Sequence, residues 1–240
     1  MIELSIYKMT NIVICSIART PIAKFCGSFQ SLKAPELGSI AIKGTISKLA
    51  SSSELTIREA FLGNVVSAGI GQAPCRQAVI GAGLPESTIC TTINKVCASG
   101  MKAVMLATQS LQAANTQTPG YAMLAGGFES MSNIPHYLQK SREGFSLGHT
   151  QLTDGLIFDG LWDIYNNQHM GMCGEKCAKD FGFTREDQDA YTIESYHRAM
   201  AAINAGVFEE IVPVEVPPKR RGGMPTIIDK DEQQIGRAHV

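Results

Sequence analysis

The chain has 240 residues, of which 44% are hydrophobic and 18% charged, and its formal net charge is −1. This length and composition are typical of a soluble globular protein that buries a substantial core. A charge so close to zero gives no electrostatic basis for binding nucleic acid or an anionic membrane surface. No uninterrupted apolar stretch approaches the roughly 20 residues that a membrane span requires.

The seven cysteines are an odd number and show no paired disulfide spacing, which indicates a reducing compartment. Residues 1–9 lack the features of a secretory signal and of a mitochondrial presequence. We therefore expect a cytoplasmic protein, or a mitochondrial one if a leader precedes the chain. Cys173 and Cys177 are spaced by one helical turn, but no second pair stands at zinc spacing, so no metal site is expected.

The first 130 residues alternate between apolar strand patterns and amphipathic helix patterns. Strands are predicted at 11–18, 58–64, 89–93 and 121–125, and helices over 35–50, 74–83 and 97–114. Strands that alternate with helices imply a parallel sheet, and in such sheets chemistry collects beyond the carboxyl ends of the strands.

The pattern changes near residue 131. Residues 133–160 carry scattered Gly, Ser, Pro and His and no long periodic element. Helices are predicted over 171–179 and from the N-cap Thr184 to about Gly206, and a strand is predicted at 211–216.

Cys97 stands where the strand 89–93 runs into the start of a helix. Unpaired backbone N–H groups and the positive end of the helix dipole favour the thiolate there, and the thiolate is the nucleophilic form. The alternative is a buried structural cysteine, which is the more common role of an arbitrary cysteine.

The sequence around Cys97 resembles the nucleophile signature of the thiolases, and further stretches match this family in the same order. They are Asn94-Lys95-Val96-Cys97-Ala98-Ser99-Gly100-Met101-Lys102-Ala103 at the nucleophile, Ala18-Arg19-Thr20-Pro21, Gly63-Asn64-Val65, Gly71-Gln72-Ala73-Pro74-Cys75-Arg76-Gln77-Ala78, Ala125-Gly126-Gly127-Phe128-Glu129-Ser130-Met131-Ser132-Asn133, and His169-Met170-Gly171. The resemblance covers residues 11–234.

The resemblance implies an α/β, thiolase-like fold: an N-terminal βαβαβαβ half-domain at residues 8–130 and an inserted α+β loop domain at 131–234 that covers coenzyme A. The family's second α/β half-domain, which carries a Gly-His-Pro histidine and a second cysteine, is expected to be missing, because none of the five histidines lies in that motif. Residues 235–240 are expected to be a non-native tail, because Ile-Gly-Arg-Ala-His-Val is the translation of ATC GGA AGA GCA CAC GTC, the start of a common sequencing-library adapter.

The activity implied by the resemblance is that of an acyltransferase of the acetoacetyl-CoA class. Such an enzyme condenses two acetyl-CoA to acetoacetyl-CoA and CoA, reversibly, through a thioester on Cys97. It uses no cofactor besides its coenzyme A thioester substrates and is a homotetramer. Two alternatives stay open: a 3-ketoacyl-CoA thiolase of fatty-acid β-oxidation, and a catalytically incomplete CoA-binding fragment. The 240 residues alone are expected to be inactive.

The resemblance also places substrate-binding residues in the loop domain. Leu161, His169 and Met170 resemble the wall that grips the acyl-CoA in short-chain thiolases, with the histidine near the thioester oxygen. Tyr196 matches a position that contacts CoA and, in potassium-activated members, the cation, so potassium is an implied ligand of the full-length protein. Taken alone, His169 would more often be a structural histidine, and Tyr196 a core tyrosine.

Overall fold

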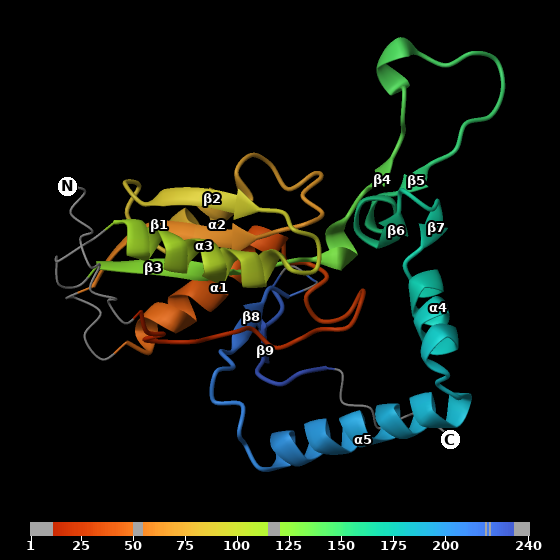
Figure 1. Ribbon diagram of the computed structural model, residues 1–240. Helices are drawn as coiled ribbons and strands as arrows, with labels where there is room; N and C mark the ends of the chain where they lie inside the picture. Colours follow the sequence, from red (N-terminus) through yellow and green to blue (C-terminus); the bar gives the residue numbers. More distant parts are fainter. Residues whose placement is uncertain (1–11, 50–54, 115–120, 219, 221, 233–240) are drawn as a thin grey trace, which may run out of the picture.

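The computed structural model describes residues 12–49, 55–114, 121–218, 220 and 222–232, and its centre is a three-stranded parallel sheet (Figure 1). The strands are β1 (Thr56–Gly63), β2 (Ile89–Ile93) and β3 (Tyr121–Gly127), in the spatial order β2-β1-β3. In the register, Ala60 of β1 stands opposite Cys90 on one side and Leu124 on the other. The predicted parallel sheet is confirmed.

Helices cover both faces of this sheet because alternate residues of β1 point to opposite sides. On one face, α1 (Ala34–Ser47) and α2 (Pro74–Gly81) enclose Ala60 and Leu62 in a buried cluster. On the other face, α3 (Ser99–Ala113) packs against Phe61 through small alanines. The helix and strand predictions for residues 35–127 are confirmed, with ends that differ by at most three residues.

The strand predicted at 11–18 is wrong for its described residues, 12–18, which carry no strand. The only ladder-type contact nearby is an isolated bridge between Arg19 and Ile211. A strand needs a neighbouring strand to take up its backbone hydrogen bonds. Val13 and Ile14 are 70% and 78% exposed, so the apolar pattern that predicted a buried strand has no covering layer in the described part of the chain.

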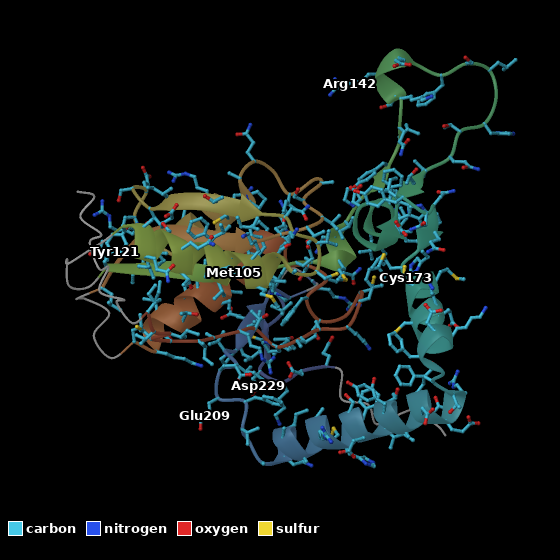
Figure 2. All side chains as sticks on the ribbon, viewed as in Figure 1. Met105, Tyr121, Arg142, Cys173, Glu209 and Asp229 are labelled. Atoms are coloured by element: carbon cyan, nitrogen blue, oxygen red, sulfur yellow. The ribbon has the colours of Figure 1, made fainter. Side chains whose placement is uncertain are left out.

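From residue 131 the chain leaves the layered half and forms an arc of short strands and turns followed by two helices (Figure 1). In chain order they are the 3₁₀ turn η2 (Met131–Asn133), β4 (His136–Tyr137), the 3₁₀ turn η3 (Ser141–Glu143), β5 (Thr153–Asp154), the π-helical turn η4 (Ile157–Leu161), β6 (Trp162–Asp163), β7 (Gln168–His169), α4 (Gly171–Phe181) and α5 (Arg185–Asn204). An arm between β4 and β5 projects from the molecule with Arg142 at its tip (Figure 2). The absence of a long element between residues 133 and 160 is confirmed.

The N-cap predicted at Thr184 is confirmed. Its hydroxyl oxygen accepts a hydrogen bond from the Asp187 N–H at 3.1 Å, and the Asp187 carboxylate in turn accepts one from the Thr184 N–H at 2.9 Å. This reciprocal arrangement satisfies two N–H groups that a helix start would otherwise leave unpaired. No side chain of α5 is buried, so capping and ion pairs along the helix support it in place of a core.

The chain then returns to the layered half through β8 (Val214–Val216) and β9 (Thr226–Ile228). The strand predicted at 211–216 is shorter than expected, because Pro213 has no N–H to donate to a ladder. Val214 is fully buried against Phe29 and Leu37, so this hairpin completes a second core below α1.

The expected tail at 235–240 lies outside the described residues. Within the described part of the chain, no helix has both the length and the apolarity needed to cross a membrane.

Candidate active site

Cys97 lies in a tight turn between β2 and α3. Its side chain is exposed, and it stands one residue before Ala98, the N-cap of α3, so it precedes the helix rather than occupying its first turn. Val96 adopts a left-handed backbone with φ of 49°, which is a costly conformation for a β-branched residue. Strain of this kind persists only where the surrounding contacts impose it.

The contacts that impose the turn come from Ser99 and Asn94. The Ser99 hydroxyl accepts from the Lys95 N–H at 2.8 Å and donates to the Val96 carbonyl at 2.6 Å. The Asn94 carbonyl Oδ1 accepts from the Val96 N–H at 3.0 Å. Polar side chains on both sides therefore hold the backbone that presents the Cys97 thiol to solvent.

Two further polar residues, Asn64 and Glu129, lie at the same edge of the sheet. They follow the carboxyl ends of β1 and β3, as Asn94 follows β2. The Glu129 carboxylate accepts from Asn64 Nδ2 at 2.8 Å and from the Val65 N–H at 2.9 Å. The sequence analysis gave these residues no role. The signal that could have found them is a polar residue within two positions of the end of each of three parallel strands.

Burial raises the pKa of the Glu129 carboxyl, and its hydrogen bonds to the Val65 and Val66 N–H groups and to Asn64 only partly offset this effect. A half-buried carboxylate is costly to maintain unless several donors face it. Perturbed carboxyl groups of this kind cluster at functional sites, so this edge of the sheet is a candidate site on physical grounds as well.

The predicted substrate wall forms one unit in the structure. Leu161 ends the π-helical turn η4, and its carbonyl accepts from the Met170 N–H at 2.9 Å. His169 pairs with Trp162 across the β6–β7 hairpin. The three residues Leu161, His169 and Met170 therefore lie together, with His169 and Met170 exposed. Short π-helical turns are frequent at functional sites.

The His169 ring is oriented by the backbone that follows it. Nδ1 accepts a hydrogen bond from the Gly171 N–H at 3.0 Å. When the ring is neutral, this leaves the proton on Nε2, which is then a hydrogen-bond donor. Gly171 permits the approach, because a Cβ built there would lie 3.2 Å from Nδ1.

Tyr196 is not brought to this unit. It lies on α5, which Figure 1 places well apart from the β6–β7 hairpin. The carboxyl ends of β1, β2 and β3, by contrast, point toward the side of the molecule where β4 to β7 lie (Figure 1). Among the described residues, no group of three or more His, Cys, Asp or Glu side chains is arranged to hold a metal ion.

Nearly the whole chain matches one known protein family. Residues 12–240 match the family model described as the thiolase N-terminal domain. The chain belongs to the thiolase family. A fold shared with thiolases also accounts for the α/β half, in which the strand-end turn carries Cys97.

Individual thiolases are similar over most of this chain. It is 52% identical over 223 residues to acetyl-CoA acetyltransferase 1 of Arabidopsis thaliana and 48% identical over 230 residues to the mitochondrial acetyl-CoA acetyltransferase of Homo sapiens, covering 92% and 95% of this chain. The crystal structure of Acat5 thiolase from Ascaris suum in complex with coenzyme A has a TM-score of 0.75 and 45% identity, and covers 84% of this chain.

The match is to part of these proteins only. The chain spans 52% of the length of both acetyltransferases and 51% of the Ascaris suum chain. Features that the relatives carry in their other half have no counterpart in these residues.

Proposed function

We propose that this chain is the nucleophile-bearing part of an acetyl-CoA C-acetyltransferase. The Cys97 thiolate attacks the carbonyl carbon of acetyl-CoA, the bond to the CoA sulfur breaks, and the CoA thiolate leaves with a proton. A second acetyl-CoA loses a proton from its α-carbon and attacks the Cys97 thioester. A carbon–carbon bond forms, the bond to Cys97 breaks, and acetoacetyl-CoA leaves. The bases for both proton transfers are expected in the half of the protein beyond this chain.

One observation carries this proposal: an exposed cysteine in a turn held by Ser99 and Asn94, at the sheet edge that faces the Leu161–His169 hairpin. Thioester formation and attack both place negative charge on an oxygen, which preorganised donors stabilise. The Nε2–H of His169 and the backbone N–H of Cys97 are the donors that we assign to these oxygens. The names of the relatives, all acetyl-CoA acetyltransferases, support the choice of acyl group.

The remaining assignments follow from the same proposal. Leu161 and Met170 pack on the pantetheine arm of the substrate, and Tyr196 binds CoA, with potassium as a further ligand in the full-length protein. Residues 8–130 are the α/β half-domain, and 131–234 the loop domain. We infer a homotetramer, as the resemblance to thiolases implies. We infer a location in the cytosol or the mitochondrion, because the relatives' names include both compartments.

The test is the formation of an acyl-enzyme by the full-length protein. Incubation with acetyl-CoA should add one acetyl group to Cys97, detected by mass spectrometry of the peptide, and Cys97→Ala should abolish both the adduct and the condensation. Cys90→Ala is the matched control and should retain the adduct, because Cys90 lies within β2 and not in the turn. An acetyl group found on Cys90 or Cys173 would overturn the assignment.

A further inference from the structure

Residues 64–66 lie between the nucleophile turn and the substrate wall and contact both. This segment follows β1 directly, and Asn64 and Val66 are 2% and 4% exposed. Because the segment is buried and short, a shift of its backbone would move whatever packs on either side of it.

On the nucleophile side, the link is Asn94. Its Nδ2 donates to the Val65 carbonyl at 3.2 Å, while its Oδ1 accepts from the Val96 N–H at 3.0 Å. One side chain thus connects the segment to the strained residue that precedes Cys97. The position of Val65 therefore influences the direction in which the thiol points.

On the wall side, the link is Val66. A Cβ built on Gly160 would lie 3.3 Å from Val66 Cγ2, so the π-helical turn packs directly on this side chain. Gly160 immediately precedes Leu161, whose carbonyl holds Met170. Three residues after this segment, Gly69 packs near Pro135, because a Cβ built on Gly69 would be 3.6 Å from the Pro135 ring.

Besides Asn94, the side chain that holds the segment is Glu129. Its Oε2 accepts from the Val65 N–H at 2.9 Å and from the Val66 N–H at 3.3 Å, and its Oε1 accepts from Asn64 Nδ2 at 2.8 Å. Removal of this carboxylate leaves the Val65 and Val66 N–H groups without their acceptor, while Asn64 Nδ2 keeps only the Phe128 carbonyl at 3.2 Å. Each such loss costs more than the bond itself contributes, so the segment must shift to find new partners.

From these contacts we propose that Glu129 is a positioning residue that sets the separation between the Cys97 turn and the Leu161–His169 wall. The inference rests on the proposed function. In that function one acyl group must contact both the Cys97 turn and the Leu161–His169 wall, so the separation between them affects the rate. Attack on a thioester requires the reacting atoms to be held near contact distance, and a displacement of about 1 Å can cost on the order of 100-fold in rate.

The experiment compares Glu129→Ala and Glu129→Gln in the full-length protein. Each rate is divided by the amount of protein whose Cys97 reacts with iodoacetamide when the reaction has run to completion, so that unfolded or blocked protein is not counted. For Glu129→Ala, kcat should fall about 10- to 100-fold while the KM for acetyl-CoA changes less than about threefold. Glu129→Gln keeps an acceptor for the Val65 and Val66 N–H groups. Its side-chain amide nitrogen cannot accept from Asn64 Nδ2, but Asn64 Nδ2 keeps the Phe128 carbonyl as an acceptor at 3.2 Å. Glu129→Gln should recover kcat to within about fivefold of wild type.

Glu59 provides the matched control, because its carboxylate on β1 accepts from the Ser110 hydroxyl at 2.9 Å and does not touch residues 64–66. Glu59→Ala should leave kcat per reactive Cys97 unchanged. A kcat for Glu129→Ala within about twofold of wild type, or an equal loss in Glu59→Ala, would overturn the proposal. If the wild-type protein forms no acetyl adduct, the proposed function fails. The initial alkylation rate of Cys97 then still tests Glu129, and an equal rate in wild type and Glu129→Ala would refute its role.

Discussion

Gly63, at the end of β1, touches Ser99, at the start of α3, so closely that no side chain fits between them. A Cβ built on Gly63 would lie 2.7 Å from Ser99 Cβ and 2.9 Å from the Gly100 nitrogen. Ser99 is the residue whose hydroxyl holds the turn around Cys97. The missing side chain at Gly63 therefore lets the end of β1 pack directly against the turn that carries Cys97.

Gly63→Ala should destabilise the protein by about 1–3 kcal/mol, because the neighbouring atoms are backbone and a short side chain and cannot move away cheaply. The measurement is the free energy of unfolding in urea. Gly100→Ala is the control, since a Cβ at Gly100 meets nothing within 4 Å and should stabilise the helix by up to about 1 kcal/mol. Equal effects of the two substitutions would show that the approach at Gly63 is not tight.

Substitutions of His169 test whether its neutral ring carries the proton on Nε2, as inferred from the hydrogen bond that Nδ1 accepts from the Gly171 N–H. His169→Ala should lower kcat/KM for acetoacetyl-CoA thiolysis by about 100- to 1,000-fold, which is typical of losing one donor to a developing oxyanion. His169→Gln places an amide N–H near the position of Nε2 and should recover part of the activity. His169→Asn can accept from the Gly171 N–H, but its shorter side chain does not bring its amide N–H to the position of Nε2, so it should not. Equal recovery by both variants would remove the donor role from Nε2.

The sequence predicted much of the layered half because its signals there are local. Helix α2 begins at Pro74 and β2 is bounded by polar turn residues, so the hydrophobic periodicity and the residues that start or end an element predict the same boundaries. Residues 12–18 failed for the opposite reason. A β-branched apolar run reports a preference for burial and extension, but a strand also requires a partner, and the partner is a property of the fold.

Those parts of the candidate site that are formed by one continuous stretch of sequence could be predicted. Cys97 and the pair His169 and Met170 fall in such stretches, and the structure adds how the backbone orients them. Glu129 was missed because its role depends on residues 64–66, which lie more than sixty positions earlier and meet it only when β1 and β3 pair. Contacts across a parallel sheet leave no periodic trace in the sequence.

Asp231 joins the end of the described chain to its start. Its carboxylate accepts from both terminal nitrogens of Arg19, at 2.8 and 3.1 Å, which lowers the pKa of Asp231 below its ordinary value of 3.8. The folded state thus binds this proton less tightly than the unfolded state does. The stabilisation is present above the unfolded pKa and is lost as the pH falls through the folded one.

Asp231→Asn should therefore reduce the free energy of unfolding by about 1.5–3 kcal/mol at pH 7, and by progressively less below about pH 4. Urea unfolding at several pH values measures both effects. The control is Asp229→Asn, an exposed carboxylate two residues earlier (Figure 2), which should change little at any pH. A difference between wild type and Asp231→Asn that stays constant down to pH 2 would contradict the ion-pair account.

An apolar stripe on α3 faces away from the sheet. Met101, Val104 and Met105 are 70%, 46% and 48% exposed, while Ala103 on the opposite side of the helix is fully buried. Exposed patches of this kind drive association. The 240-residue chain alone should self-associate, and Met101→Lys combined with Met105→Glu should raise its monomeric fraction in size-exclusion chromatography. Met224→Lys, at an 86% exposed residue elsewhere, should not. A monomeric wild-type chain would contradict this expectation.

The last prediction concerns acyl chain length in the full-length protein. Leu161 and Met170 are tied together by one backbone hydrogen bond, and Gly160 beside them packs on Val66, so the wall cannot easily retreat. A pocket closed around a two-carbon acyl group must displace packed side chains to admit a longer one, at about 1–3 kcal/mol. That is a factor of about 5 to 150 in rate if the cost falls on the transition state.

The measurement is kcat/KM for thiolysis of 3-ketoacyl-CoAs of four, six, eight and ten carbons, with and without potassium. A steep fall after four or six carbons agrees with the acetoacetyl-CoA assignment. A flat or rising series would assign the protein to fatty-acid degradation instead, with Cys97 still the nucleophile.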